Sequence, residues 1–281
     1  MRITELHVYP IKGAAGVALT RTTLDAFGMA SDRRWMIVDE RGVFVSQREY
    51  PELALLRVQL HPDELVIRSV RAGEARVPHQ GAPGSSVRVR VWGDTVDAMD
   101  AGDAAAHTIS AHLGTPVRLV HMPDSSVRNV NPDYGRASDR VSFADAFPLL
   151  LIAQESLDAL NARLAEPIPI LRFRPNIVIA GGRAHAEDEW RRIRLGRIEC
   201  VVVKPCSRCA TTTVDPATGV RGKEPLRTLT TYRSWNQKVW FGQNLIHRQQ
   251  GEIGVGDPVE VLELGSARPP LVPRLALNVP A

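Results

Sequence analysis

The sequence of 281 residues contains only three cysteines, and all of them, Cys200, Cys206 and Cys209, lie close together. Small secreted domains that depend on disulfides usually carry an even number of cysteines spread along the chain. An odd and clustered set therefore argues against a secreted disulfide framework. A four-cysteine zinc site is excluded because there is no fourth cysteine, and none of the eight histidines stands at zinc-finger spacing from the pair.

Long apolar runs are also missing. Residues 147–153 form one of the longest, far short of the roughly 20 apolar residues that span a bilayer. The N-terminus begins directly with a strand-like pattern and lacks the apolar core of a signal peptide. We therefore expect a soluble, cytoplasmic protein with no membrane partner.

Aromatic residues are scarce, at 5%, and the sequence contains no P-loop, no Gly-x-Gly-x-x-Gly turn and no Ser/His/Asp spacing. The net charge is +4, but the arginines are spread along the chain, whereas nucleic-acid binders concentrate basic residues and add aromatics for stacking. We expect no nucleic-acid partner. Two interpretations stay open: a mildly basic soluble protein, and a basic pocket for a small anionic or phosphorylated ligand.

The hydrophobic patterns predict a mostly β fold with a few helices, of the α+β class. Short runs rich in Val, Ile, Leu and Thr, separated by Gly, Pro and Asp, are typical of strands. Helices are predicted at 103–113, ended by Gly114, and at 155–164 and 226–232, with a long loop at 123–138. The predicted strands are residues 3–9, 17–24, 35–38, 53–60, 65–70, 87–92, 95–99, 149–153, 176–180, 194–196 and 198–203.

The simplest arrangement of these elements is two β-barrel-like parts. We predict an N-terminal domain at 1–122, a second domain at 123–267 and a proline-rich, loosely held tail at 268–281.

The segment from Lys204 to Pro216 is the most informative one, because it combines two thiols with nearby cations. Thiolates, which ligate soft metals, persist at neutral pH where positive charge lowers the thiol pKa. A dithiol redox centre would stand before a helix, and the β-branched run 211–214 disfavours a helix. A single-thiolate site for a soft transition metal fits better; half a zinc site and two buried residues at a strand end stay open as alternatives.

Several cations stand at predicted strand ends, where they could converge on an anion. They are Lys12, Arg33, Arg174 and Arg208. Lys12 adjoins a flexible glycine, and arginine binds phosphate in a bidentate manner. Pro175 predicts an extended backbone at Arg174. The polar residues 185–189 predict a solvated turn.

Short motifs along nearly the whole chain resemble one family. They are Tyr9-Pro10-Ile11-Lys12, Asp32-Arg33-Arg34-Trp35, Phe173-Arg174-Pro175-Asn176, Ala186-Glu187-Asp188 before Trp190, Cys206-Ser207-Arg208-Cys209, Thr212-Thr213-Val214-Asp215-Pro216, Lys223-Glu224-Pro225-Leu226 and Phe241-Gly242-Gln243. With these motifs the sequence resembles the MOSC proteins, which are related to the C-terminal domain of molybdenum-cofactor sulfurase. It is most similar to the branch containing the mitochondrial amidoxime-reducing component and its bacterial counterparts.

The resemblance implies a β-rich N-terminal domain, a MOSC β-barrel and a molybdenum–pterin cofactor whose metal is held by one cysteine. The position that matches this ligand, and thus the catalytic and metal residue, is Cys209. Positions that match family cofactor contacts are Lys12, Gly13, Arg33, Ala144, Asp145, Arg174, Ser207, Arg208 and Asn244, and Asn176 matches a residue beside the pocket. Asp145 is the candidate for orienting the pterin amino groups. The chain departs from the family at three of these positions: the family often has serine at Gly13, a hydroxyl residue at Ala144, and sometimes an aromatic at Asn244.

The implied function is reduction of N-oxygenated small molecules, such as amidoximes, hydroxylamines or N-hydroxylated bases. The chain lacks the four cysteines of an iron–sulfur cluster, so the electrons are expected from a separate ferredoxin-, flavodoxin- or cytochrome-type protein. Binding of pyridoxal phosphate is not expected. One alternative is a carrier of the molybdenum cofactor or of sulfur that does not turn over, and another is a zinc-binding structural protein.

Overall fold

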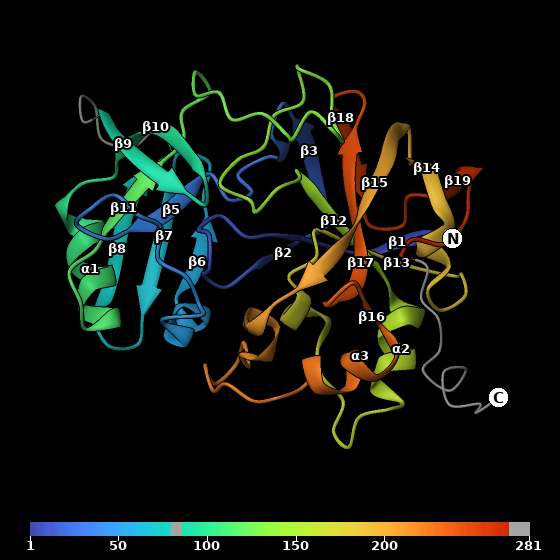
Figure 1. Cartoon of the computed structure of the whole chain (residues 1–281). Coiled ribbons are helices and arrows are strands. Elements are labelled where there is room, and N and C mark those ends of the chain that lie inside the picture. Colours follow the sequence, from blue (N-terminus) through green and yellow to red (C-terminus); the bar gives the residue numbers. More distant parts are fainter. Residues whose placement is uncertain (80–85, 270–281) are drawn as a thin grey trace.

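Alternating and fully apolar strand segments assemble the chain into two lobes that lie side by side in the computed structural model (Figure 1). The structure describes residues 1–79 and 86–269. The predicted tail at 268–281 therefore lies almost wholly outside the described residues. The mostly β, α+β class expected from the sequence is confirmed.

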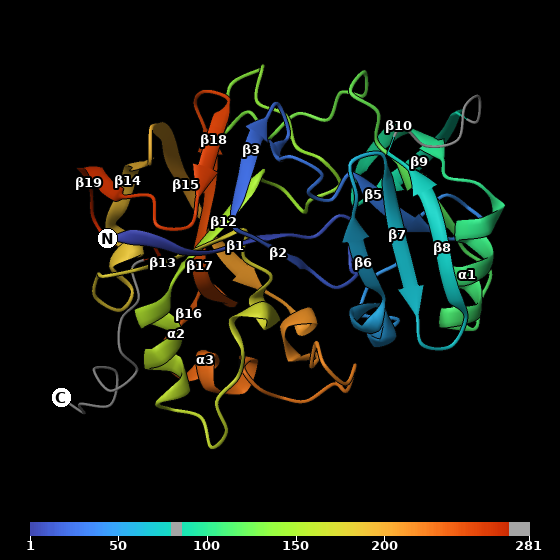
Figure 2. The same cartoon turned by 180° about the vertical axis from the view of Figure 1, so that it is seen from behind.

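The smaller lobe contains two antiparallel sheets, with strand orders β5-β11-β10-β9 and β6-β7-β8. Helix α1 packs against β7, β8 and β11 and closes one side of the lobe (Figure 2). The elements of this lobe are β5 (Trp35–Val38), η1 (Pro51–Leu55), β6 (Arg57–Leu60), β7 (Glu64–Ser69), β8 (Gly73–Pro78), β9 (Ser86–Val91), β10 (Asp94–Asp100), α1 (Asp103–Leu113) and β11 (Arg118–His121).

The larger lobe is built around a nine-stranded sheet of order β19-β14-β15-β17-β12-β13-β1-β2, in which β16 also pairs with β17. A small sheet of β18, β3 and β4 packs beside it. The elements of this lobe are β1 (Arg2–Val8), β2 (Val17–Leu19), β3 (Arg21–Asp25), β4 (Gly28–Met29), β12 (Leu149–Ala153), α2 (Gln154–Asn161), η2 (Ile170–Phe173), β13 (Ile177–Ala180), η3 (Ala186–Glu189), β14 (Trp190–Leu195), β15 (Ile198–Arg208), η4 (Ala210–Thr213), α3 (Leu226–Tyr232), β16 (Ser234–Trp235), β17 (Lys238–His247), β18 (Gly251–Gly254) and β19 (Val259–Leu264).

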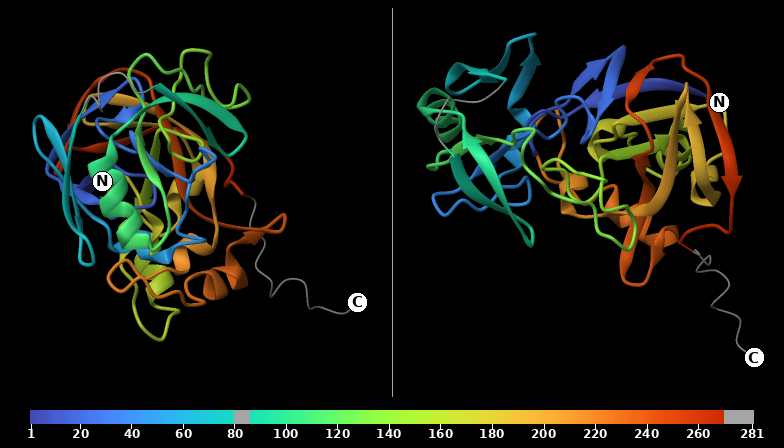
Figure 3. Two further views of the ribbon diagram at one scale, coloured as in Figure 1. Left: turned by 90° about the vertical axis from the view of Figure 1, so that its left-hand side faces the viewer. Right: turned by 90° about the horizontal axis from the view of Figure 1, so that it is seen from above.

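The N-terminal strands belong to the larger lobe, although the next hundred residues build the smaller one. Strand β1 pairs with β13, and β3 pairs with β18. The chain then crosses to the smaller lobe before β5 and returns after β11, as the view from above shows (Figure 3). The domain limits predicted at 122 and 267 stay a prediction; the structure adds that the earliest strands pack with the latest ones.

Most predicted elements have the expected type, and the differences have local causes. The predicted strand 53–60 begins as η1, because Pro51 stands at its first turn and favours a helical start. The helix predicted at 155–164 ends at Asn161, whose side chain bonds both backbone groups of Ile168. Among the described residues, no helix is long and apolar enough to cross a bilayer.

The prediction of a solvated turn at 185–189 is wrong. Glu187 and Asp188 are buried, at 1% and 6% exposure. The reason is a set of distant partners: Arg233 forms a two-bond ion pair with Asp188, at 2.7 and 3.0 Å, and the Ser156 hydroxyl donates to Glu187 Oε1 at 2.7 Å. A buried charge is tolerated when it is paired and hydrogen-bonded in this way.

The burial of Glu187 predicts a pH dependence of stability. Burial raises the pKa of Glu187 from 4.5 to about 7, and the hydrogen bond from Ser156 only partly opposes this. Between these two pH values the folded chain binds more protons than the unfolded chain. This side chain therefore lowers the free energy of unfolding by up to about 3 kcal/mol as pH rises through that window.

Glu187→Gln should abolish that contribution, so the variant should lose less stability than the wild type between pH 5 and pH 8 in urea unfolding. Glu263→Gln, at a half-exposed ion pair with Arg192, is the matched control and should keep the wild-type slope. Equal slopes for the wild type and Glu187→Gln would contradict the prediction.

Candidate functional site

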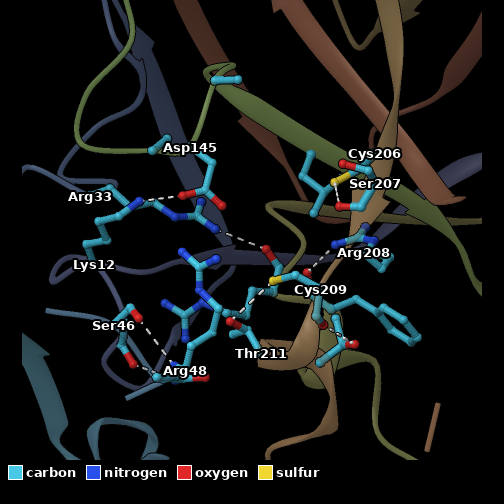
Figure 4. Close-up of a pocket in the computed structure, with 18 of the residues that line it drawn as sticks. Lys12, Arg33, Ser46, Arg48, Asp145, Cys206, Ser207, Arg208, Cys209 and Thr211 are labelled. Carbon is cyan, nitrogen blue, oxygen red and sulfur yellow. Dashed lines mark hydrogen bonds and ion pairs between the residues drawn. The ribbon is translucent and has the colours of Figure 1, made fainter. Parts of the chain in front are cut away.

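A cavity of about 990 Å³, its open mouth included, lies between the lobes. It is large enough for a cofactor-sized ligand. All eleven residues that the sequence singled out line it: Lys12, Gly13, Arg33, Ala144, Asp145, Arg174, Asn176, Ser207, Arg208, Cys209 and Asn244. The close-up shows several of them facing one another across the cavity (Figure 4).

Segments far apart in the sequence supply these side chains. Lys12 and Gly13 follow β1, Ala144 and Asp145 precede β12, and Arg174 and Asn176 precede β13. Strands β1, β13 and β12 are neighbours in the large sheet, so these residues gather at the ends of adjacent strands. Ser207 and Arg208 end β15 and Cys209 follows it, Asn244 lies in the neighbouring β17, and Arg33 stands in the turn just before β5.

Gly242 fixes the geometry around Arg208. Its φ is +76°, and a Cβ there would lie 2.7 Å from Ile152 Cγ1 and 2.9 Å from the Leu151 carbonyl. Only glycine accepts this combination of backbone angle and close approach. With β17 held so close to β12, the guanidinium of Arg208 donates to the carbonyls of Phe241 (2.7 Å) and Phe173 (3.0 Å).

The cavity is strongly cationic. Among the described residues it is lined by six cations, Lys12, Arg33, Arg48, Arg172, Arg174 and Arg208, and by a single carboxylate, Asp145. Three of the six are ion-paired: Lys12 with Asp145, Arg33 with Asp32, and Arg172 with Asp215. The surplus positive charge favours an anionic ligand.

The guanidinium groups of Arg174 and Arg208 are incompletely bonded. The Nη2 atom of each is buried and has no acceptor among the described residues. Burial, reinforced by the charge of Arg33, lowers the pKa of Arg174 to about 10, so the group stays charged at neutral pH at a cost in stability. Its charge is partly offset by stacking 4.2 Å from the Tyr9 ring centroid and by an Nη1 bond of 2.6 Å to the Ala14 carbonyl. Both side chains line the cavity, so an anion bound there would lie beside their positive charge.

Three cavity residues other than glycine have backbones in the left-handed region. Their φ values are 49° for Arg33, 54° for Trp92 and 55° for Arg174. Bulky residues rarely adopt this region, and such strain concentrates at functional sites. The extended backbone predicted for Arg174 is therefore wrong: this residue ends η2 in the left-handed conformation, which presents its carbonyl to Arg33 Nη2 at 3.1 Å.

Asp145 joins the two lobes and is exposed to the cavity. Its Oδ1 accepts a hydrogen bond from Lys12 Nζ at 2.5 Å and another from Trp92 Nε1 at 3.2 Å. Enclosure acts to raise the pKa of Asp145, but the Lys12 ammonium lowers it more, so the pKa lies well below its usual range. Burial lowers the pKa of Lys12, and the Asp145 carboxylate acts against this.

The three thiols have different environments. Cys200 is buried in the core of the larger lobe, where burial raises its pKa to about 12. Cys206 lines the cavity but is half-buried, and its pKa is also raised by burial, with Arg208 opposing. Cys209 is exposed, with Thr211 Oγ1 3.5 Å from its Sγ. Of the three thiols, Cys209 is the most open to a ligand in the cavity.

The zinc alternative has no support in the part of the chain that the structure describes. Within residues 1–79 and 86–269, no three His, Cys, Asp or Glu side chains come together as a ligand set.

Three further predicted residues, Asn176, Asn244 and Ala144, shape the cavity through contacts with their neighbours. Asn176 is buried, and its Oδ1 accepts bonds of 3.1 Å from Arg33 Nη1 and from the Leu150 amide, so it positions its neighbours. The Asn244 side chain bonds the carbonyls of Lys204 and Pro205. Ala144 offers the cavity no hydroxyl, and its carbonyl accepts from Arg128.

Gly13 has a local reason for departing from the family pattern. Its φ is +89°, and a Cβ there would lie 3.3 Å from Leu53 Cδ1. Its carbonyl accepts a 2.5 Å bond from Gln47 Nε2 of the smaller lobe. A serine at this position would be strained in this backbone.

Sequence reasoning missed the wall that the smaller lobe contributes, which consists of Phe44, Val45, Ser46, Gln47, Arg48 and Trp92. It also missed that Arg172, which stands beside a predicted motif, lines the cavity and pairs with Asp215. No local pattern marks the wall, because its segments lie outside the strands and reach the cavity only when the lobes meet.

The cavity fits a molybdenum–pterin cofactor in its donor set. An exposed thiol suits a soft metal, and the unmet guanidinium groups suit phosphate and other anionic oxygens.

Residues 1–116 match the family described as the MOSC N-terminal beta barrel domain, and residues 138–260 match the MOSC domain. Mitochondrial amidoxime-reducing component 1 of Homo sapiens is 34% identical over 279 residues, which cover 92% of this chain and 82% of that protein. The protein of the same name from Xenopus laevis is 32% identical, with 92% and 81% covered. Mitochondrial amidoxime reducing component 2 of Homo sapiens is 31% identical, with 92% and 82% covered.

The unmet charge in the cavity predicts anion binding by the cofactor-free protein. Inorganic pyrophosphate should raise the Tm of that protein by a few degrees, since ligand at ten times its Kd stabilises by about 1.4 kcal/mol. In Arg174→Gln this shift should shrink to less than half in a thermal denaturation series. Arg183→Gln, at an exposed ion pair of the same lobe, should retain it. A full shift in Arg174→Gln would contradict the assignment of Arg174 to an anion site.

Proposed function

This chain belongs to the family of two-domain MOSC proteins that includes the mitochondrial amidoxime-reducing components, and on that premise we propose that it is a molybdenum-dependent reductase of N-hydroxylated compounds. Its substrates would be small molecules such as amidoximes, hydroxylamines and N-hydroxylated bases. A separate electron-carrier protein would supply the electrons.

One observation carries the proposal: an exposed cysteine, Cys209, stands in a cavity with six cations and one carboxylate among its described lining residues. The exposed thiol is accessible to a soft metal, and the surrounding cations suit an anionic cofactor. Membership in this family supports a molybdenum–pterin cofactor as the ligand of the cavity.

Different cavity residues would bind different parts of the cofactor. Cys209 would ligate the metal, and Arg174, Arg208, Arg33 and Lys12 would bind phosphate and pterin oxygens with charge-assisted hydrogen bonds. When bound, a molybdenum–pterin cofactor supplies two-electron transfer coupled to oxygen-atom transfer. The exposed carboxylate of Asp145 would accept hydrogen bonds from the amino groups of the pterin.

The reaction also requires a supply of protons and the release of water. Reduction of an N-hydroxy compound to the parent amine or amidine consumes two electrons and two protons and releases one water molecule. Lys12 Nζ, whose pKa burial lowers, holds an ionisable proton at the edge of the cavity. The Lys12–Asp145–Trp92 chain of hydrogen bonds spans the two lobes beside that position.

Two cysteine variants test the ligand assignment. Cys209→Ala should lose bound molybdenum and the reduction of benzamidoxime, because the cavity would lose its exposed thiol. Cys206→Ala should retain most of both, since that thiol is half-buried and has a raised pKa. Protein from a molybdate-fed host would be compared by elemental analysis and by turnover with a chemical electron donor. Loss of both properties in Cys206→Ala alone would show that the ligand is Cys206.

The same preparation separates the proposed reductase from a carrier of the cofactor or of sulfur. A reductase should contain about one molybdenum per chain and reduce benzamidoxime with at least one donor. Stoichiometric molybdenum without turnover, whatever donor is supplied, would favour the carrier.

A further inference from the structure

One cation of the cavity stands apart from the others. Of the six, Arg48, Arg174 and Arg208 have no carboxylate partner among the described residues. Arg174 and Arg208 are half-buried in the larger lobe, and their Nη2 atoms are fully enclosed. Arg48 is exposed and belongs to the wall of the smaller lobe.

The side chain of Arg48 is held in place although it lacks an anionic partner. Its guanidinium stacks on the indole of Trp92, 4.5 Å from the ring centroid. The Trp92 ring is in turn fixed by contact with Phe44, at 4.7 Å between centroids, and by the Nε1 bond to Asp145. A guanidinium stacked in this way keeps its edge N–H groups free for an anion.

Hydrogen bonds from both lobes also hold the backbone of Arg48 in place. Its amide lies 3.3 Å from Ser46 Oγ, and its carbonyl accepts a 2.6 Å bond from Arg221 Nη2 of the larger lobe. Arg221 bonds the Gln47 carbonyl as well, at 3.1 Å. The position of Arg48 is thus set before any ligand arrives, which lowers the entropic cost of binding one.

We propose that Arg48 determines substrate specificity: it selects N-hydroxylated substrates that also carry a carboxylate or a similar anionic group. The proposal rests on the proposed function and refines its substrate class. Ser207 and Arg208 lie on one side of the close-up and Ser46 and Arg48 on the other, with the Cys209 sulfur between them (Figure 4). An enclosed cation suits a resident cofactor, whereas an exposed cation at the facing wall suits a ligand that enters and leaves.

Binding, measured by isothermal titration calorimetry on the holoprotein, tests the proposal without depending on turnover. The probes are benzamidoxime and 4-carboxybenzamidoxime, which differ by one carboxylate. The wild type should bind the carboxylate about tenfold more tightly, the effect of one charge-assisted hydrogen bond. Arg48→Gln should bring the two affinities within about twofold while leaving benzamidoxime binding unchanged.

Two further variants sharpen the result. Arg88→Gln removes an exposed arginine of the same lobe that pairs with Asp97 outside the cavity, and it should retain the full preference. Trp92→Leu should weaken the preference, because it removes the aromatic support, and Trp92→Phe should largely restore it. Molybdenum content should be unchanged in Arg48→Gln.

Several results would overturn the proposal. They are equal affinities of the wild type for the two probes, no binding of either, a preserved preference in Arg48→Gln, or loss of molybdenum in that variant, which would assign Arg48 to the cofactor. A protein that binds with the expected preference but reduces neither compound would contradict the proposed reductase and leave the selectivity of Arg48 standing.

Discussion

The arrangement of the site depends on one constraint: six cations must be brought together between the lobes with too few carboxylates to neutralise them. The protein meets it by pairing three of them, with Asp145, Asp32 and Asp215. It places aromatic rings under others, with Tyr9 beneath both Arg33 and Arg174. Left-handed backbone at Arg33 and Arg174 is a further cost of the same arrangement. A fold selected for stability alone has no reason to concentrate such costs, and their concentration is the physical argument for a ligand site here.

The path of the chain explains how these charges converge. Strand β1 is part of the larger lobe, and the residues after it lead toward the smaller lobe, so Lys12 and Gly13 lie where the lobes meet. Gln47 and Arg221 then bond across the gap, from the smaller lobe to Gly13 and from the larger lobe to Arg48. Because cavity residues themselves form the contacts between lobes, a ligand bound there would also hold the lobes together. Binding of such a ligand would therefore favour the arrangement in which the lobes are in contact.

Local patterns predicted much of the fold, and long-range partners decided the rest. Strand β5, helix α1 and helix α3 have their predicted bounds. Both the apolar periodicity and the helix-ending Gly114 are local features, which depend only on residues close together in the sequence. The burial of Glu187 and Asp188 could not be predicted, because it depends on Ser156 and Arg233, which are distant in sequence. The convergence of Lys12, Arg33, Arg174 and Arg208 could be predicted from strand ends and motif matches. The wall around Arg48 and Trp92 could not, because its segments carry no motif and meet the cavity only through tertiary contact.

The two walls of the cavity have different chemistry, and this difference is a physical reason for them to have different roles. On the larger lobe, the guanidinium groups are half-buried, and their Nη2 atoms are closed off from solvent. When an anionic ligand leaves, water can hydrate these charged groups only in part, so its departure costs free energy. On the smaller lobe, Arg48 is exposed and stacked, so water can replace a departing anion at little cost. Slow exchange suits a resident cofactor and fast exchange suits a substrate. Asp145 stands between them and accepts hydrogen bonds from both sides, from Lys12 and from Trp92.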